Sequence, residues 1–310
     1  MTKSPELVSV NLDTLGLLRI TGTQASGLLQ GQLSCDIGEV TSHKSCIAVH
    51  CNPQGRVLAT LRLFYYQDAY YLLLPQSNLE GLYKDLKKYA LFYKVHLQII
   101  DSITPRIGLI GIHLSEFLVN RISDFQAEEN NSVYLLEGVI IIMLPGDIPR
   151  AILLGLSPSS WIETIALPSI PASYWEYLDI NSGLATIYPN TRGLFTPHHI
   201  NCHNTGAISF TKGCYTGQEI IARMHYLGKL TQQLYHLTVL SQNLPEPGVP
   251  VLDSKDNRQG IVVMAVWRPD YLQKTVSTYQ ALVSLKNKAV HEPLFIEGSL
   301  IQTIEAVSSR

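Results

Sequence analysis

Hydrophobic positions recur along the first hundred residues with the two-residue period of strands and the three-to-four-residue period of helices. Residues 15–22 (LGLLRITG) predict a strand, and residues 23–33 predict a short amphipathic helix. Two β-rich runs follow within residues 44–66, on either side of the tetrapeptide NPQG. Pro53 suits the second position of a turn and Gly55 the fourth, so this stretch predicts a β-hairpin.

The same two periods continue to about residue 170. Residues 68–75 predict a further strand, and residues 77–94 predict a helix that Ser77 caps at its N-terminus. Between 105 and 170 short strand and helix patterns alternate around a polar loop at 123–132. The strands expected there are 106–112, 132–137 and 139–144, and the helices lie around 114–122 and 159–165.

After Gly228 the pattern changes to about six evenly spaced strand runs, and no helical period follows. Turn-forming stretches separate these runs, namely PEPGVP, DSKDNRQG and HEP. Such spacing predicts a small β-barrel at the carboxyl end. Because hairpins join part of the earlier strands, we expect α+β domains rather than a doubly wound parallel sheet.

Composition sets limits on the class of protein. A chain of 310 residues is long enough for two or three domains, and 46% hydrophobic residues with a net charge of −2 are typical of globular proteins. This charge provides no general attraction for nucleic acids. The amino terminus shows no signal-peptide pattern, and the longest apolar run (139–144) is too short to span a membrane. Five cysteines without a C-x-x-C pair favour free thiols, so we expect a cytoplasmic protein without membrane association.

The segment SFTKGCYTGQEIIARMHYLGK, residues 209–229, carries the most specific pattern of the chain. Thr216 and Glu219 have the spacing of a capping box and predict a helix start. Apolar residues then predict one buried helix face, and Gly228 is expected to end the helix. The predicted apolar face consists of Ile220, Ile221, Met224 and Leu227.

Cys214 precedes this predicted helix start, and Lys212 lies two residues before it. The positive end of a helix and a nearby ammonium both favour the thiolate form, which would make Cys214 unusually reactive. The alternative is a buried cysteine that acts as a small hydrophobic residue. Both interpretations stay open from these residues alone.

The segment HHINCH raises the hypothesis of a metal site. His199 and His203 are four residues apart and would share a helix face, with Cys202 beside them as a soft ligand. The segment follows Pro197 and precedes NTG, which favours a loop. We therefore interpret its histidines, His198 included, as solvated loop residues and predict no metal ligands.

Trp175 lies in the segment SYWEYLDINSG with two acids close behind it, Glu176 and Asp179. An indole with a carboxylate at its edge suits a heteroaromatic ring. The alternative to a ligand-binding role is that Trp175 is a buried residue on the core-facing side of a helix.

Several segments together resemble the YgfZ family, folate-binding relatives of the glycine-cleavage T protein. The central one is KGCYTGQE at Lys212 to Glu219, a highly specific motif. The other segments are LLQGQLSCD, AVHCNPQGRVLATLRLF, LKKYALFYKV and GAISFTKGCYTGQEIIAR, followed by the barrel-like tail. The resemblance covers most of the chain.

The resemblance implies an α+β protein of three domains in a ring around a channel. Two would be ferredoxin-like α+β domains and the third the C-terminal β-barrel. Residues 1–40 and 105–229 would form the domain with the motif, residues 41–104 an inserted domain, and residues 230–310 the barrel.

The resemblance also implies a ligand and site residues. Tetrahydrofolate or a derivative would bind in the channel. Cys214 matches the family's essential cysteine, with Lys212 beside it in the catalytic motif. The positions expected to contact folate are Trp175, Asp179, Asn181, Gln218, Glu219 and Arg223. Asn181 stands where the T-protein relatives commonly have a glutamate, and Leu15 stands near the place of a second tryptophan found in some members.

The implied role is to support the assembly or repair of iron–sulfur clusters and, through it, the methylthiolation of tRNA. The expected partners are folate and iron–sulfur enzymes or assembly proteins, whereas direct contact with tRNA stays open. We expect a monomeric accessory factor. Two alternatives are a folate-dependent aminomethyl transferase and a metal-binding module that uses the histidine cluster. Asn181 speaks against the transferase, because an amide cannot make the charge-assisted pair of a carboxylate.

Overall fold

The computed structural model describes residues 4–100, 105–122, 125, 130–156, 161–269 and 277–307. The chain divides into two compact units, and each unit is assembled from separate stretches of sequence. Unit 1 comprises residues 1–28, 37–46 and 62–178, and unit 2 comprises residues 29–36, 47–61 and 179–310. The three-domain boundaries expected from the sequence stay a prediction.

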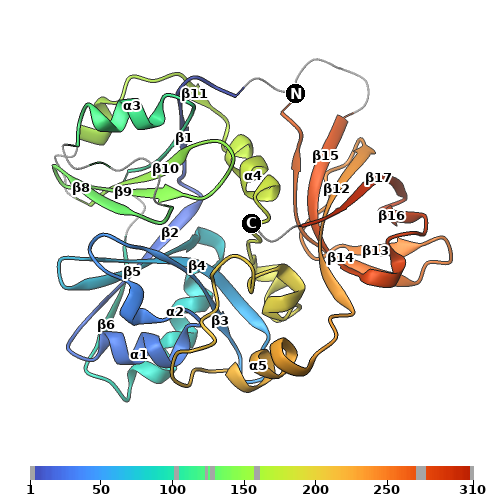
Figure 1. The fold of residues 1–310 in the computed structure, drawn as a ribbon, viewed down its shortest axis with the longest axis horizontal. Coiled ribbons are helices and arrows are strands. Elements are labelled where there is room, and N and C mark those ends of the chain that lie inside the picture. Colours follow the sequence, from blue (N-terminus) through green and yellow to red (C-terminus); the bar gives the residue numbers. More distant parts are fainter. Residues whose placement is uncertain are drawn as a thin grey trace. The chain divides into compact units, whose positions relative to one another are not determined.

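A six-stranded sheet of order β11-β1-β7-β10-β9-β8 belongs to unit 1 (Figure 1). All its neighbours pair antiparallel except β1 and β11, which are parallel. Its strands are β1 (Val8–Asn11), β7 (Arg106–Ile110), β8 (Val133–Leu136), β9 (Val139–Leu144), β10 (Arg150–Gly155) and β11 (Ser169–Ile170).

Both faces of this sheet are covered, which explains the uninterrupted apolar run of β9. Ile140 and Ile142 face a core that includes residues of α4 (Ala172–Asn181). Ile141 and Met143 face a second core with α3 (Leu114–Val119). Successive strand residues point to opposite faces, so a strand buried on both sides needs no polar positions. The expected helix around 159–165 is a single 3-10 turn, η2 (Trp161–Thr164), and residues 157–160 lie outside the described part.

A five-stranded sheet has the order β3-β4-β5-β2-β6. Its strands are β2 (Leu15–Thr21), β3 (Cys46–Cys51), β4 (Val57–Tyr66), β5 (Ala69–Pro75) and β6 (His96–Ile100). The helix α2 (Gln76–Ala90) buries Leu79, Leu82 and Leu86 against it, as the helical spacing predicts.

The predicted cap of α2 is wrong. Pro75 occupies the N-cap position, and the structure gives it no capping side chain among the described residues. The amide of Gln76 donates to the carbonyl of Thr14 at 2.8 Å, so the strand β5 leads directly into the helix. Ser77 consequently lies inside the first turn, where its hydroxyl cannot take the N-cap role.

The carboxyl-terminal strands form a closed barrel of order β12-β15-β14-β13-β16-β17, coloured orange to red in Figure 1. Its strands are β12 (Gln232–Ser241), β13 (Pro250–Asp253), β14 (Arg258–Trp267), β15 (Ser277–Lys286), β16 (Leu294–Ile296) and β17 (Ser299–Ala306). Buried residues from these strands form one core of their own. The barrel and the mixed sheets with few helices confirm the predicted α+β fold class.

Short helices complete the fold. They are α1 (Ala25–Gln32), η1 (Ile37–Glu39), η3 (Pro189–Thr191), η4 (Pro197–Ile200), α5 (Gln218–Leu227) and η5 (Asn287–Ala289). Among the described residues, every helix is too short or too polar to span a membrane.

Candidate functional site

The loop that bears the KGCYTG motif, residues 209–217, is held by one buried lysine; we call it the signature loop. Lys212 is 7% exposed, and its ammonium donates to three backbone carbonyls in unit 2. The acceptors are Gln30 O at 2.8 Å, Leu33 O at 2.7 Å and Cys35 O at 2.7 Å. All three protons of the ammonium are therefore used.

Gln30 lies in the last turn of α1, and Leu33 and Cys35 follow directly after the helix, so a cation is favoured at this position. The last carbonyls of a helix have no partner within the helix and carry partial negative charge. The last turn of α1 contains no basic residue of its own. Lys212, about 180 residues later in the chain, donates to all three carbonyls. Burial lowers the pKa of Lys212 to about 8, while Cys35 and Asp36 act in the opposite direction.

Backbone hydrogen bonds fix both ends of the signature loop. The amide of Ser209 donates to the carbonyl of Ser34 at 2.9 Å, and the amide of Thr216 donates to the carbonyl of Gly31 at 3.0 Å. The predicted capping box is wrong. The hydroxyl of Thr216 faces Gly31 O and the side chain of Gln32 at 3.4 Å, and α5 begins at Gln218 after Gly217 as N-cap.

Glycines allow the signature loop to contact the β3–β4 turn closely. Gly217 has φ +85°, and a Cβ there would lie 2.7 Å from the carbonyl oxygen of Asn52. Gly55 has φ +67°, and its Cβ would lie 3.0 Å from Cβ of Ile220. Both positions require glycine for backbone conformation and for space. The predicted NPQG hairpin therefore packs against the start of α5.

Cys214 is the one exposed cysteine of the five, all of which lie in the described residues. Cys46 is half-buried, and Cys35, Cys51 and Cys202 are buried. Burial raises the pKa of the Cys51 thiol, and Cys202 raises it further. Burial also raises the pKa of Cys202 to about 12. Among these thiols Cys214 thus combines solvent access with a fixed loop.

Three predicted site residues lie on the first two turns of α5. Gln218 is half-buried, and Glu219 and Arg223 are exposed. The helix does not bury the apolar face that its spacing predicted. Ile221 is buried, but Leu227 is 82% exposed. The first turns of α5 therefore present polar side chains beside the signature loop.

Trp175 is a core residue of unit 1. It is 5% exposed and belongs to the core formed with α4, and the Arg150 guanidinium lies 5.0 Å from its ring centroid. Gly108 allows the close approach, because a Cβ there would lie 2.4 Å from an indole carbon. The indole has no open face for stacking, so this side chain does not fit the stacking role expected for it. Asp179 is half-buried and Asn181 is exposed, and both belong to unit 2.

His198 of HHINCH is buried and His199 and His203 are half-buried, which corrects the interpretation of these histidines as solvated. His198 is 1% exposed and stacks on His203, with ring centroids 5.0 Å apart. His225 of α5 stacks on Phe210 at 3.8 Å and lies 6.1 Å from His198. Burial and the neighbouring histidines lower the pKa of His198 to about 4. In the described part of the chain, histidine, cysteine and acidic residues form no group of three suited to a metal.

The sequence could not reveal the partners of Lys212. They are backbone carbonyls, which carry no residue-type signal. The one available signal was indirect, namely a helix at 25–32 whose last turn lacks a cation.

The fold is that of the glycine-cleavage T protein. It is similar to the crystal structure of glycine cleavage system aminomethyltransferase T from Bartonella henselae, with a TM-score of 0.75 and 14% sequence identity, over 98% of this chain and 86% of that one.

Curated relatives named tRNA-modifying protein YgfZ define the family. The protein from Colwellia psychrerythraea is 32% identical over 80% of this chain and 75% of its own length. The protein from Hamiltonella defensa is 31% identical over 82% and 78%, and that from Vibrio vulnificus 30% identical over 78% and 74%. No family model matches the chain. At this identity and coverage the chain belongs to the YgfZ family, as the signature motif predicted.

Proposed function

We propose that this protein is a folate-binding accessory factor that supports the assembly or repair of iron–sulfur clusters and, through it, the methylthiolation of tRNA. The observation that carries the proposal is the exposed thiol of Cys214 on a loop that the buried Lys212 holds in place. The name of the relatives refers to tRNA modification, which supports the proposed link to tRNA.

Lys212 has a positioning role in this proposal. Its three protons bind carbonyls, so it fixes the loop instead of transferring a proton to a substrate. A rigid loop presents the Cys214 thiol to a partner protein in one orientation, which lowers the entropy cost of the encounter. The thiolate is the form that attacks electrophiles or binds metal. Iron–sulfur enzymes or their assembly proteins are the partners we propose, with the protein acting as a cytoplasmic monomer.

The folate part of the proposal relies on polar side chains of unit 2. Asp179, Asn181, Gln218 and Glu219 provide acceptors for ring N–H groups, and the Arg223 guanidinium suits the carboxylates of a folate tail. Tetrahydrofolate would supply its reduced ring or a one-carbon group. Aminomethyl transfer stays a prediction without an observation of its own in support.

Replacement of Cys214 tests the proposed function. In bacteria that lack their own family member, we expect wild type to restore methylthiolated tRNA and Cys214→Ser to reduce it at least tenfold. Cys46→Ser is the matched control, because it removes a half-buried thiol outside the loop. Circular dichroism should show that both variants fold. Full restoration of methylthiolated tRNA by Cys214→Ser would overturn the role of the thiol.

Calorimetry with tetrahydrofolate tests the ligand. We expect Arg223→Met to weaken binding about tenfold and Trp175→Phe to leave it within twofold, because the Trp175 ring is buried in its own core. Absence of binding to wild type at millimolar tetrahydrofolate would remove folate from the proposal but leave the thiol test unaffected.

A further inference from the structure

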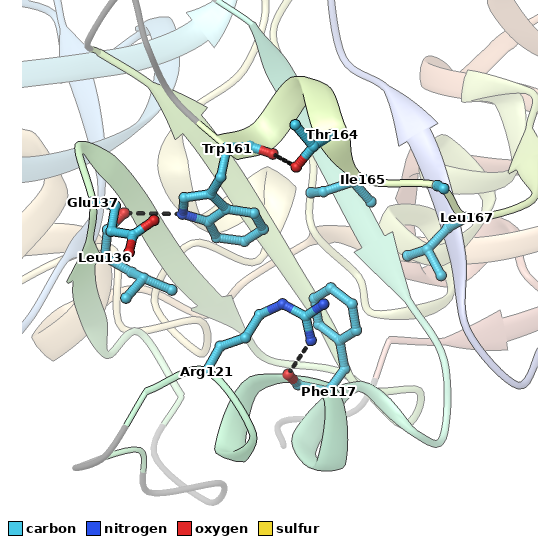
Figure 2. A pocket seen from close by; sticks show the side chains of 9 residues that line it. Phe117, Arg121, Leu136, Glu137, Trp161, Thr164, Ile165 and Leu167 are labelled. Atoms are coloured by element: carbon cyan, nitrogen blue, oxygen red, sulfur yellow. Dashed lines mark hydrogen bonds between the residues drawn. The ribbon is translucent and has the colours of Figure 1, made fainter.

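A pocket lies within unit 1, and none of the predicted site residues lines it (Figure 2). It has a volume of about 550 Å³, which is in the range of small-molecule sites. The end of α3, the β8–β9 turn and the segment that begins at η2 line this open pocket. Its lining comprises Phe117, Arg121, Leu136, Glu137, Trp161, Thr164, Ile165, Ala166 and Leu167.

Two flat groups in this pocket have fixed orientations. The indole nitrogen of Trp161 donates to the carbonyl of Leu136 at 3.1 Å, which ties the ring to the end of β8. The Arg121 guanidinium lies 3.8 Å from the ring centroid of Phe117, and its Nη1 donates to the Phe117 carbonyl at 3.1 Å. Figure 2 shows the indole on one side of the pocket and the Arg121–Phe117 pair on the other. Aromatic rings and a guanidinium plane are both good stacking surfaces.

Two opposite charges complete the pocket. Glu137 lies beside the indole nitrogen and Arg121 lies across from it (Figure 2). Neither residue forms an ion pair with any other described residue. Glu137 is an acceptor only, and Arg121 keeps four N–H donors after its bond to Phe117. The polar groups are therefore available to a ligand.

We propose that this pocket binds a planar 2-amino-4-oxopyrimidine ring, the hydrogen-bonding unit of guanine. The ring would stack between Trp161 and the Arg121–Phe117 pair. Its N1–H and exocyclic amine are adjacent donors, and the two oxygens of the Glu137 carboxylate accept both. Adenine and cytosine place a ring acceptor beside their amine, which a carboxylate repels. Uracil has one N–H between two carbonyls.

The same ring unit occurs in guanine nucleotides and in pterins. Arg121 favours an anionic group attached to the ring, because a guanidinium pairs with phosphate or carboxylate in two-point geometry. A guanine mononucleotide carries phosphate, and a folate carries carboxylates. We take the guanine nucleotide as the ligand, and the experiment separates the two sources.

Calorimetric titration of the full-length protein with GMP tests this proposal. We expect saturable binding, with AMP at least tenfold weaker. Glu137→Gln should weaken GMP binding at least tenfold and reduce the preference over AMP, because an amide replaces one acceptor with a donor. Arg121→Met should weaken GMP more than guanosine. Trp161→Phe keeps an aromatic surface and should retain binding within about fivefold.

A matched control exists elsewhere in the chain. Glu297 has φ +47° and precedes Gly298, just as Glu137 has φ +46° and precedes Gly138. Glu297→Gln changes the same residue type in the same kind of turn and should leave GMP binding unchanged. This control separates a loss of ligand contact from a general effect of altering such turns.

Four results would overturn the proposal in whole or in part. No GMP binding at 5 mM would overturn the nucleotide as ligand. Equal affinity for GMP and AMP, or binding that Glu137→Gln leaves unchanged, would overturn the recognition of the ring by Glu137. The fourth result is that tetrahydrofolate binds where GMP does not, and that Glu137→Gln weakens the binding of tetrahydrofolate. That result would support recognition of the ring by Glu137 and would identify a pterin as its source.

Discussion

Single residues decide how the signature loop is held, and the two glycines of its motif have different tasks. Gly217 adopts a left-handed conformation against the carbonyl of Asn52. Gly213 has no heavy atom within 4 Å of where its Cβ would lie, leaving out its chain neighbours. The sequence gives both as glycine beside Lys212 and Cys214, so the motif alone cannot separate a position that needs glycine from one that tolerates a side chain.

This difference predicts two unequal alanine variants. Gly217→Ala should lower the free energy of unfolding by about 2 kcal/mol, from the left-handed conformation and the 2.7 Å approach to Asn52 O. Gly213→Ala should stay within about 0.5 kcal/mol of wild type. Urea denaturation monitored by circular dichroism measures both. Equal losses in the two variants would contradict the assigned contact.

At the scale of elements, the apolar spacing predicted most strands and α2 correctly, because buried faces determine the period. Helix starts were predicted less well. Ser77 and Thr216 have the residue types of caps, but Pro75 and Gly217 occupy the cap positions. At both starts contacts with distant segments decide the geometry, namely the carbonyls of Thr14 and Gly31. Local preference is a weak signal when a tertiary partner competes.

The histidine cluster between η4 and α5 failed as a sequence prediction for a related reason. Three histidines near a proline and an asparagine are typical of a polar loop, yet His198 is buried among His203, Phe210 and His225. Whether a neutral imidazole is buried depends on which other segments pack against it in the folded protein. The sequence alone does not identify those segments.

Burial of His198 predicts instability in acid. The pKa of His198 is about 4 in the folded protein, against an ordinary value of 6.5. Between these two pH values the unfolded chain binds more protons than the folded one, so the free energy of unfolding falls as the pH falls. From pH 7 to pH 5 this residue should cost about 2 kcal/mol. His198→Phe should flatten the measured fall in unfolding free energy between pH 7 and pH 5. An unchanged slope in His198→Phe would contradict the prediction.

At the scale of the whole molecule, the family resemblance predicted the T-protein-like fold and the barrel correctly. It also implied that residues 1–40 share a domain with the signature loop and that residues 41–104 form an inserted domain, and these boundaries stay a prediction. Residues 29–36 and 47–61 belong to the same compact unit as residues 179–310. Sequence order does not show that the neighbouring residues 37–46 and 62–178 belong to the other compact unit, because the contacts that define a unit join segments far apart in the chain.

This arrangement predicts different behaviour for two fragments. Residues 230–310 contain the whole barrel and its core and should fold cooperatively by circular dichroism. Residues 179–310 also contain the signature loop but lack Gly31 and Ser34. Hydrogen exchange should therefore find the amides of Thr216 and Ser209 unprotected in that fragment and protected in the full chain. Protection of both amides in the fragment would show that the loop folds without its early partners.

The three hydrogen bonds of Lys212 also have a consequence for protein synthesis. The carbonyls of Gln30, Leu33 and Cys35 leave the ribosome long before the lysine that binds them, because 177 to 182 residues separate the partners. At 5–20 residues per second that interval is roughly ten to forty seconds. During this time the three carbonyls lack the ammonium that binds them in the folded protein. The order of translation thus delays completion of the thiol-bearing loop until most of the polypeptide has been made.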